Sequence, residues 1–164
     1  MDAFIKLTTK LTNPRISIED KLKEICRITA LLVKGADRVS LWRFNESFDG
    51  IEAIICYDVK SNNFTRGQKL NRIDFDAYFK GILEKEVINA PKARTNPYTM
   101  CFNESYFNPL NIYSLLDFIL HDDFSPTGVI CCESVGKVSH WSNDNIDSLR
   151  RVANASSMYF KFNG

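Results

Sequence analysis

Two adjacent cysteines followed by a glutamate are the first residues in this sequence whose types could do chemistry. They lie in the stretch TGVICCESVG, from Thr127 to Gly136. Neighbouring thiols can ligate a metal or exchange electrons, but the same stretch is rich in strand-forming residues. Successive side chains of a strand point to opposite faces, so the two thiols diverge and cannot hold one ion together. The predicted faces are Val129, Cys131, Glu133 and Val135 on one side, and Ile130, Cys132 and Ser134 on the other. We therefore expect these cysteines to pack as small hydrophobic side chains.

The remaining reactive residue types form no recognisable motif. The five cysteines, at positions 26, 56, 101, 131 and 132, are odd in number and include no C-x-x-C pair, which favours reduced thiols over a disulfide framework. The two histidines, His121 and His140, lack the spacing of a zinc site. No P-loop, G-x-G-x-x-G or Ser–His–Asp motif is present. We predict no metal site and no catalytic residue, and hence a protein that is not an enzyme.

Composition predicts one ordinary globular domain. The chain has 164 residues, enough to bury a core without metal or disulfides. Lys and Arg total 21 against 20 Asp and Glu, and this balance argues against nucleic acid or an anionic membrane as partner. No signal peptide and no apolar stretch of about 20 residues is visible, so we expect a cytoplasmic protein. Twelve Phe and six Tyr predict an aromatic core or pocket.

Helices are predicted at both ends of the chain and in its middle. Residues 2–11 favour a short helix, and Ser17 and Asp20 have the spacing of a capping box for an amphipathic helix over 17–35. Asp74 is the expected N-cap of a helix over 74–86, and Ser142 that of a terminal helix over 142–161, with Phe160 on its apolar face. One more helical turn is expected over 103–111.

Two hairpins are predicted between these helices. Strands over 38–44 and 51–59 flank a turn, as do strands over 112–123 and 129–135, and a short strand is expected over 87–89. Residues 60–68 favour a polar loop, 69–73 a short extended piece, and 90–100 a loop punctuated by Pro91 and Pro97. This order of elements predicts an α+β fold, an antiparallel sheet with helices on its faces.

Four segments together resemble a known family. They are RVSLWRFNESFDGIEAIICYD, LNRIDFDAYFKGILEKEVINAPKARTNP, ESYFNPLNIYSLLDFIL and GVICCESVGKVSHWSNDNIDSLRRVA. In this order they resemble the GAF domains of bacterial sensor histidine kinases and diguanylate cyclases, over about residues 20–160. The sequence departs from the family at Asn89, Lys92 and Asn96, where relatives carry carboxylates, and at Ser134, where they carry histidine. It also lacks the N-K-x-F-D-E motif of cyclic-nucleotide GAF domains, which argues against a cyclic nucleotide.

The resemblance implies a single domain over 1–164, with an N-terminal extension over 1–16 and flanking helices over 17–35 and 142–161. Its expected core is a six-stranded antiparallel sheet with helices on both faces. It further implies a sensory or regulatory module in a bacterial protein, with a small molecule held between the sheet and a covering segment. The flanking helices would pair in a homodimer and pass the signal to a kinase or cyclase output domain. The sequence leaves open whether the chain is a fragment or stands alone.

The resemblance also selects candidate ligand-binding residues. Aromatic residues gather in the covering segment, Arg94 is the expected anchor for an anionic group, and Asp117 is a second polar candidate. The full set is Trp42, Phe75, Tyr78, Arg94, Tyr98, Cys101, Tyr106, Asp117 and Cys132. The alternative that these aromatic side chains merely fill the core stays open. No cofactor is identified, and we expect neither haem nor bilin.

Two other functions stay open. Free-methionine-sulfoxide reductases share the GAF fold and work through several cysteines, and the pair to consider here is Cys101 with Cys132. The second alternative is a dimerisation scaffold that binds no ligand.

Overall fold

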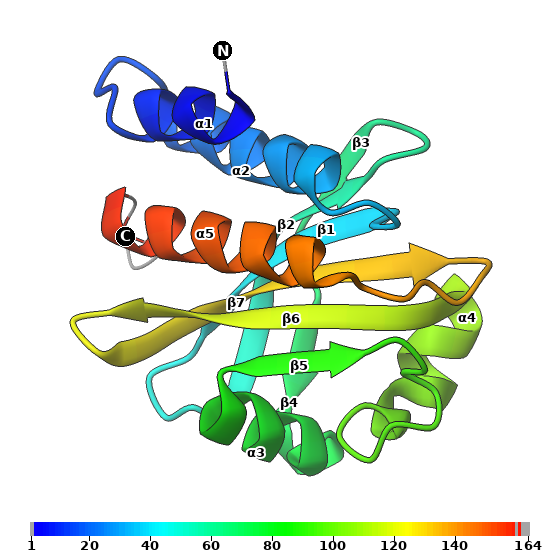
Figure 1. Cartoon of the computed structure of the whole chain (residues 1–164). Coiled ribbons are helices and arrows are strands. Elements are labelled where there is room, and N and C mark those ends of the chain that lie inside the picture. Colours follow the sequence, from blue (N-terminus) through cyan, green and yellow to red (C-terminus); the bar gives the residue numbers. More distant parts are fainter. Residues whose placement is uncertain (1, 160, 162–164) are drawn as a thin grey trace.

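The computed structural model describes residues 2–159 and 161, and it has three layers (Figure 1). An antiparallel sheet forms the middle layer. The helices α1 (Ala3–Leu11), α2 (Ile18–Leu32) and α5 (Asn143–Tyr159) cover one face. Helix α3 and a run of short helical turns cover the other face. The predicted α+β class, with helices on both faces of the sheet, is therefore confirmed.

The sheet has the strand order β3-β2-β1-β7-β6-β5, and the short strand β4 pairs with β2 beside this path. Its strands are β1 (Arg38–Phe44), β2 (Gly50–Asp58), β3 (Asn63–Thr65), β4 (Lys69–Asn71), β5 (Val87–Ala90), β6 (Ile112–Asp122) and β7 (Ser125–Val135). All the pairings are antiparallel. The six-stranded prediction is thus confirmed for the main path. Strand β3 lies in the segment expected to be a polar loop, and β7 begins earlier than predicted because it pairs with β6 as far as the turn.

In the helix layer, formed by α1, α2 and α5, side-chain caps mark the starts of α2 and α5. Ser17 Oγ accepts from the backbone N–H of Asp20 at 3.1 Å, and Ser142 Oγ accepts from that of Asn145 at 3.1 Å, so both predicted caps are confirmed. Helix α2 ends at Leu32, before the predicted end at residue 35. Of the predicted terminal helix, Phe160 lies outside the described residues.

Helix α1 packs onto both of the other helices in this layer. Its Leu7 and Leu11 are 0% and 1% exposed, in the same core cluster as residues of α2 and α5. The N-terminal segment therefore covers part of the surface that α2 and α5 would otherwise present.

The cover layer is less regular than the helix layer. It consists of η1 (Arg72–Asp74), α3 (Asp76–Lys85), η2 (Met100–Phe102), the π-helical turn η3 (Asn103–Phe107) and α4 (Asn108–Leu110). Asp74 does not cap α3 as predicted. It lies in a 3₁₀ turn, closed by the bond from Phe75 N–H to the Arg72 carbonyl, and α3 begins only after this turn.

The sheet separates two hydrophobic cores, and the alternation along β7 explains how. Ile130 and Cys132 lie in the core shared with the helix layer, whereas Val129 and Cys131 lie in the core shared with the cover layer. The predicted division of the two cysteines between opposite faces is confirmed. Close contact between β1 and β7 depends on Gly128, because a Cβ there would lie 2.0 Å from the Trp42 carbonyl oxygen.

Candidate functional site

A small cavity lies between the sheet and the cover layer. Its walls are Trp42, Ile51, Leu70, Tyr78, Phe102, Tyr106, Leu115, Asp117, Cys131 and Glu133. Its volume of about 20 Å³ holds about one water molecule, whereas pockets for drug-sized ligands span roughly 300–1,000 Å³. In this conformation aromatic rings fill most of the space between sheet and cover.

A larger hollow of about 330 Å³ opens on the outside of the molecule beside α2 and β2. Among its walls, Glu19 and Arg66 pair with each other. None of the buried, unpartnered side-chain atoms found among the described residues belongs to that hollow, but two belong to the small cavity. The small cavity is therefore the better candidate for a site.

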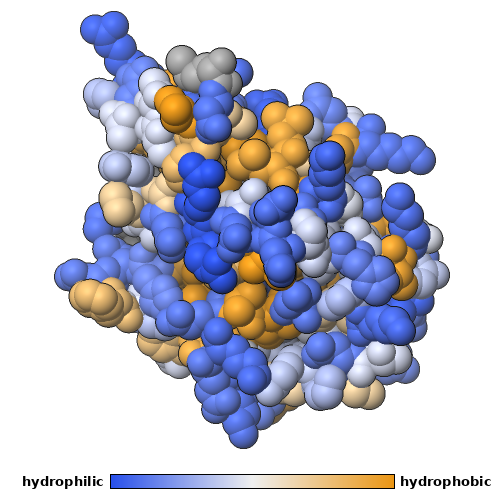
Figure 2. Space-filling view, in the orientation of Figure 1, coloured by the Kyte–Doolittle hydropathy of each residue, from blue (hydrophilic) through white to orange (hydrophobic). Residues whose placement is uncertain are grey.

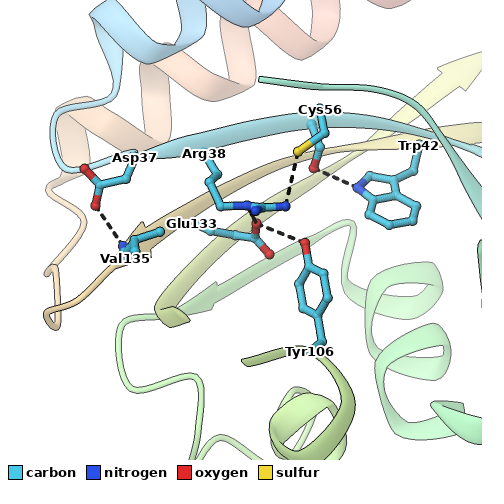
Figure 3. Close-up of polar contacts among 8 residues, drawn as sticks. Asp37, Arg38, Trp42, Cys56, Tyr106, Glu133 and Val135 are labelled. Carbon is cyan, nitrogen blue, oxygen red and sulfur yellow. Dashed lines mark hydrogen bonds and ion pairs between the residues drawn. The ribbon is translucent and has the colours of Figure 1, made fainter. Parts of the chain in front are cut away.

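The first of these atoms belongs to Glu133, a carboxylate on β7 that is 1% exposed. Its Oε1 accepts from Arg38 Nε at 3.3 Å and from the Tyr106 hydroxyl at 3.1 Å, whereas Oε2 has no partner. Figure 3 shows Arg38 reaching Glu133 along the sheet, while Tyr106 approaches from the segment over 100–110 of the cover layer, called the cover segment below. Arg38 lies directly opposite Glu133 in the β1–β7 register, and its Nη2 also contacts Cys56 Sγ at 3.2 Å. The cluster joins three separate parts of the chain.

The second atom belongs to Asp117 on β6, which is 2% exposed. The Tyr78 hydroxyl of α3 donates to its Oδ2, and Oδ1 has no partner. Burial raises the pKa of Asp117 to about 8, so this carboxyl group is mostly protonated at neutral pH. A neutral acid beside an apolar cavity is a group that a bound ligand can ionise.

Burial also raises the pKa of Cys101, Cys131 and Cys132, so these side chains are neutral thiols rather than reactive thiolates. Cys131 lies opposite Asp117 in the β6–β7 register and lines the cavity. Cys132 was predicted at the site, but it points to the helix layer, because neighbours along a strand face opposite sides. Cys101 packs against the cover-side core instead, so the sheet separates the two thiols of the reductase hypothesis.

The structure brings four of the predicted residues together at the cavity: Trp42, Tyr78, Tyr106 and Asp117. Phe75 lies behind them, with its ring centroid 4.7 Å from that of Phe102. Tyr98 packs on Gly81 of α3 under the Lys85 ammonium, away from the cavity wall. Both prove to be supporting residues of the cover layer.

Arg94, predicted as the ligand anchor, has a structural role instead. Its Nε donates to the Ile112 carbonyl at 2.8 Å and its Nη2 to the Phe107 carbonyl at 3.4 Å. The guanidinium also stacks over the Tyr113 ring, 3.9 Å from its centroid. Arg94 therefore ties the loop to the end of the cover segment and the start of β6, and it is not among the residues that line the cavity.

Sequence reasoning missed Glu133, Arg38 and Cys131 as site residues. A signal was present, because the alternation along β7 places Glu133 on the same face as Cys131 and a charged residue there interrupts an apolar strand. Among residues 2–159 and 161, no three His, Cys, Asp or Glu side chains are grouped to hold a metal ion. Within the same range, no helix has the length and apolar character needed to cross a membrane.

The Arg38–Glu133 pair predicts a non-additive effect on stability. Glu133→Gln should lower the free energy of unfolding by about 3–5 kcal/mol, because it leaves a largely buried guanidinium without its counter-charge. Arg38→Met should cost a similar amount, and the double variant should cost less than the sum. Urea unfolding of the four proteins measures the coupling. Glu52→Gln, which breaks the exposed pair with Lys69, is the control and should change stability by about 0.5 kcal/mol or less. Strict additivity would contradict the pairing.

Asp117 predicts a pH dependence of stability. Its folded pKa of about 8 exceeds the ordinary value of 3.8, so the unfolded chain loses this proton first as pH rises. The stability that Asp117 contributes to the folded state is thus fully present below about pH 4 and is lost progressively toward pH 8. The free energy of unfolding of Asp117→Asn, measured with urea, should therefore rise relative to that of the wild type between pH 5 and 7. The difference should grow by up to about 1.4 kcal/mol per pH unit. Asp122→Asn, at the end of the same strand, controls for loss of one carboxylate. A constant difference between Asp117→Asn and wild type would refute the assignment.

Comparison with known proteins identifies the fold. No protein-family model matches the sequence, and no curated protein matches it. Among solved structures, the phycocyanobilin-bound GAF domain of a cyanobacterial phytochrome is similar with a TM-score of 0.76 and 15% identity, covering 95% of this chain and 90% of that one. The GAF domain of a two-component sensor histidine kinase from Bacillus halodurans is similar with a TM-score of 0.67 and 15% identity, covering 88% of this chain and 93% of that one.

The chromophore-binding domain of Stigmatella aurantiaca phytochrome P1 is similar over 97% of this chain, with a TM-score of 0.72 and 13% identity. The chain spans only 59% of that domain's length. The sequence-based resemblance to GAF domains, those of sensor histidine kinases included, is confirmed in three dimensions. The chain has the fold of a GAF domain.

Proposed function

We propose that this protein is a sensory or regulatory GAF module that binds a small molecule between its sheet and its cover layer. One observation carries the proposal: two buried carboxyl groups line the same aromatic cavity, and each has an oxygen without a hydrogen-bond partner. Buried polar atoms are nearly always paired, so two orphans at one cavity favour a ligand that supplies the missing partners. The position between sheet and cover matches the expectation from the family.

The cavity is small, so the proposal includes movement of the cover. The segment over 100–110 passes through a 3₁₀ turn, a π-helical turn and one α-turn, and such irregular helices hold their shape through side-chain contacts. Tyr106 is the contact that joins this segment to Glu133. A ligand that takes over this partner would favour an open or shifted cover, which is a change in population between two states.

The sheet offers a direct route from the cavity to the helix layer. Asp117 and Leu116 are neighbours on β6, but Asp117 faces the cavity and Leu116 packs in the core with α2 and α5. The same holds for Cys131 and Cys132 on β7. A change in these two strands therefore acts on both faces at once. We propose that α2 and α5 carry it to an output domain, a kinase or a cyclase, in the cytoplasm of a bacterium.

The neighbours in three dimensions support a sensory role over an enzymatic one. Two of them are GAF domains of a sensor histidine kinase and of a phytochrome with a bound bilin. For this chain we propose neither haem nor bilin as the ligand, because a tetrapyrrole is far larger than a cavity of about 20 Å³. The thiol-reductase alternative loses support because its two cysteines lie in different cores.

A ligand-free dimerisation scaffold is the second candidate function, and the small cavity volume favours it. The unpartnered oxygens of Asp117 and Glu133 argue against it, since a scaffold gains nothing from them. Ligand binding therefore decides between the two functions.

We expect a screen of small metabolites to raise the melting temperature of the wild-type protein and to identify a saturable ligand. Leu70→Phe should abolish the response, because Leu70 lines the cavity at its edge and is 9% exposed, so a larger ring enters the ligand's space. Val138→Phe, at a position 43% exposed between β7 and α5, is the matched control and should respond as the wild type does. Native mass spectrometry of the purified protein checks for a ligand already bound. A broad screen without any hit would favour the scaffold.

Dimerisation is proposed to use the part of the helix layer that α1 leaves exposed. Apolar side chains remain on this layer, and Figure 2 shows hydrophobic residues at the surface in the upper part of the view. Ile18 and Leu31 of α2 are 67% and 71% exposed, and Met158 of α5 is 70% exposed. These exposed apolar side chains support the helix layer as the contact surface.

We expect the wild-type protein to have the mass of two chains in size-exclusion chromatography with light scattering. Leu31→Lys should shift the population toward the monomer, because the charge would have to be desolvated in the interface. Ile73→Lys is the matched control: it is 89% exposed but lies on η1 in the opposite layer, and it should leave the dimer intact. Equal masses for both variants would exclude α2 from the interface.

A further inference from the structure

We propose that the ligand of this cavity is a small organic cation, a primary amine whose ammonium group lies between Asp117 and Glu133. The proposal rests on the proposed ligand-binding function and narrows it to a chemical class. It follows from three features of the cavity: its two buried carboxyl groups, the type of hydrogen-bonding atoms they leave open, and its aromatic walls.

The first feature is an imbalance of ionisable groups. Two carboxyl groups, Asp117 and Glu133, line the cavity, and both are buried to 2% exposure or less. Arg38 is a cation in contact with Glu133, to which its Nε donates at Oε1. The partners of Asp117, the Tyr78 hydroxyl and the Cys131 thiol, are both neutral. A ligand that carried one positive charge would balance the charge of an ionised Asp117.

The second feature is that the open atoms are acceptors once Asp117 is ionised. Asp117 Oδ1 and Glu133 Oε2 are both carboxyl oxygens, and in the ionised form both call for N–H or O–H donors. Cys131 faces both groups, but its thiol is a weak donor that can serve one of them at most. An ammonium group carries three donors and no acceptor, which matches this arrangement. An anionic ligand would place a second negative charge beside the Glu133 carboxylate.

The third feature is the aromatic wall. Trp42, Tyr78, Phe102 and Tyr106 surround the same cavity. Their ring faces attract a cation, most strongly where water is excluded. The volume of about 20 Å³ accommodates a group the size of water, and an ammonium group is of that size. A longer amine would keep this head group in place and displace part of the cover.

Amine binding should release a proton. The groups that face Asp117 are Tyr78 from α3, and Cys131 and Glu133 from β7; each is neutral or negative, and none can neutralise a carboxylate. Asp117 therefore keeps its proton in the empty protein at neutral pH and loses it when the ammonium group arrives. Because the pKa of Asp117 in the empty protein is about 8, the Kd should increase about tenfold for each unit that pH falls below 7.

The test uses the full-length protein and three small probes of similar size: methylammonium chloride, methanol and sodium formate, at constant ionic strength. Amide spectra recorded by NMR during each titration locate binding. We expect methylammonium to shift residues of β6, β7 and the cover segment with a Kd in the millimolar range, the affinity that so few atoms allow. At pH 6 the Kd should be about tenfold higher than at pH 7.

Asp117→Asn should weaken methylammonium binding at least tenfold and remove its pH dependence. This variant is nearly isosteric with the neutral acid, so it should fold. Asp122→Asn, at the end of β6, should bind as the wild type does. The wild-type pH dependence provides a second readout that needs no variant.

The outcomes separate this inference from the proposed function. Binding of formate or methanol in the cavity, with no shift by methylammonium, would overturn the cationic class and leave the sensory module standing. The same holds if none of the three probes binds but the metabolite screen finds an anionic or neutral ligand that Leu70→Phe abolishes. Absence of binding in both experiments would overturn the inference and the proposed function together.

Discussion

The burial of the Glu133 carboxylate is the constraint on which the cover side of this molecule depends. A carboxylate that is 1% exposed is tolerated only where a cation and hydrogen-bond donors reach it. Arg38 supplies the charge from the neighbouring strand, and Tyr106 supplies a hydroxyl from the cover segment. The second contact is long-range in sequence, so satisfying Glu133 also fixes where η3 lies on the sheet. Arg94 completes this attachment from the far side of the loop by holding the carbonyls of Phe107 and Ile112.

The sheet connects the cavity to the helix layer because its strands are buried on both faces. Most residues of β6 and β7 are buried, so each strand presents one set of side chains to each core. Such a strand cannot shift toward the cover without moving the side chains that α2 and α5 pack against, since protein interiors are close-packed. The helix layer is in turn closed by Leu7 and Leu11 of α1. The N-terminal segment is therefore part of the packed helix layer, and any partner must pack beside it.

Local rules predicted much of this fold but only part of the site. The caps at Ser17 and Ser142 and the split of Cys131 from Cys132 follow from short-range geometry, and the structure confirms them. Asp74 was wrong as a cap because a 3₁₀ turn takes up the residues before α3, and no pattern distinguishes the two starts. The place of Arg94 outside the cavity wall could not be predicted, because its partners are backbone carbonyls, which leave no trace in the sequence. Glu133 had a signal in the alternation, but its pairing with Arg38 depends on the β1–β7 register, which is set by tertiary structure.

The polarity of the cavity, more than its volume, distinguishes a binding site from a filled core. A core with no ligand would be more stable with an apolar residue in place of Asp117, because burial there holds the carboxyl group far from its ordinary pKa and leaves one oxygen without a partner. The aromatic packing around it shows that the chain can fill space at this position with apolar side chains. The molecule thus carries an acid that destabilises its folded state as pH rises toward neutrality. A ligand that ionises and pairs the Asp117 carboxyl group would remove this destabilisation. Part of its binding free energy would therefore come from satisfying a buried group that has an unpartnered oxygen in the empty protein.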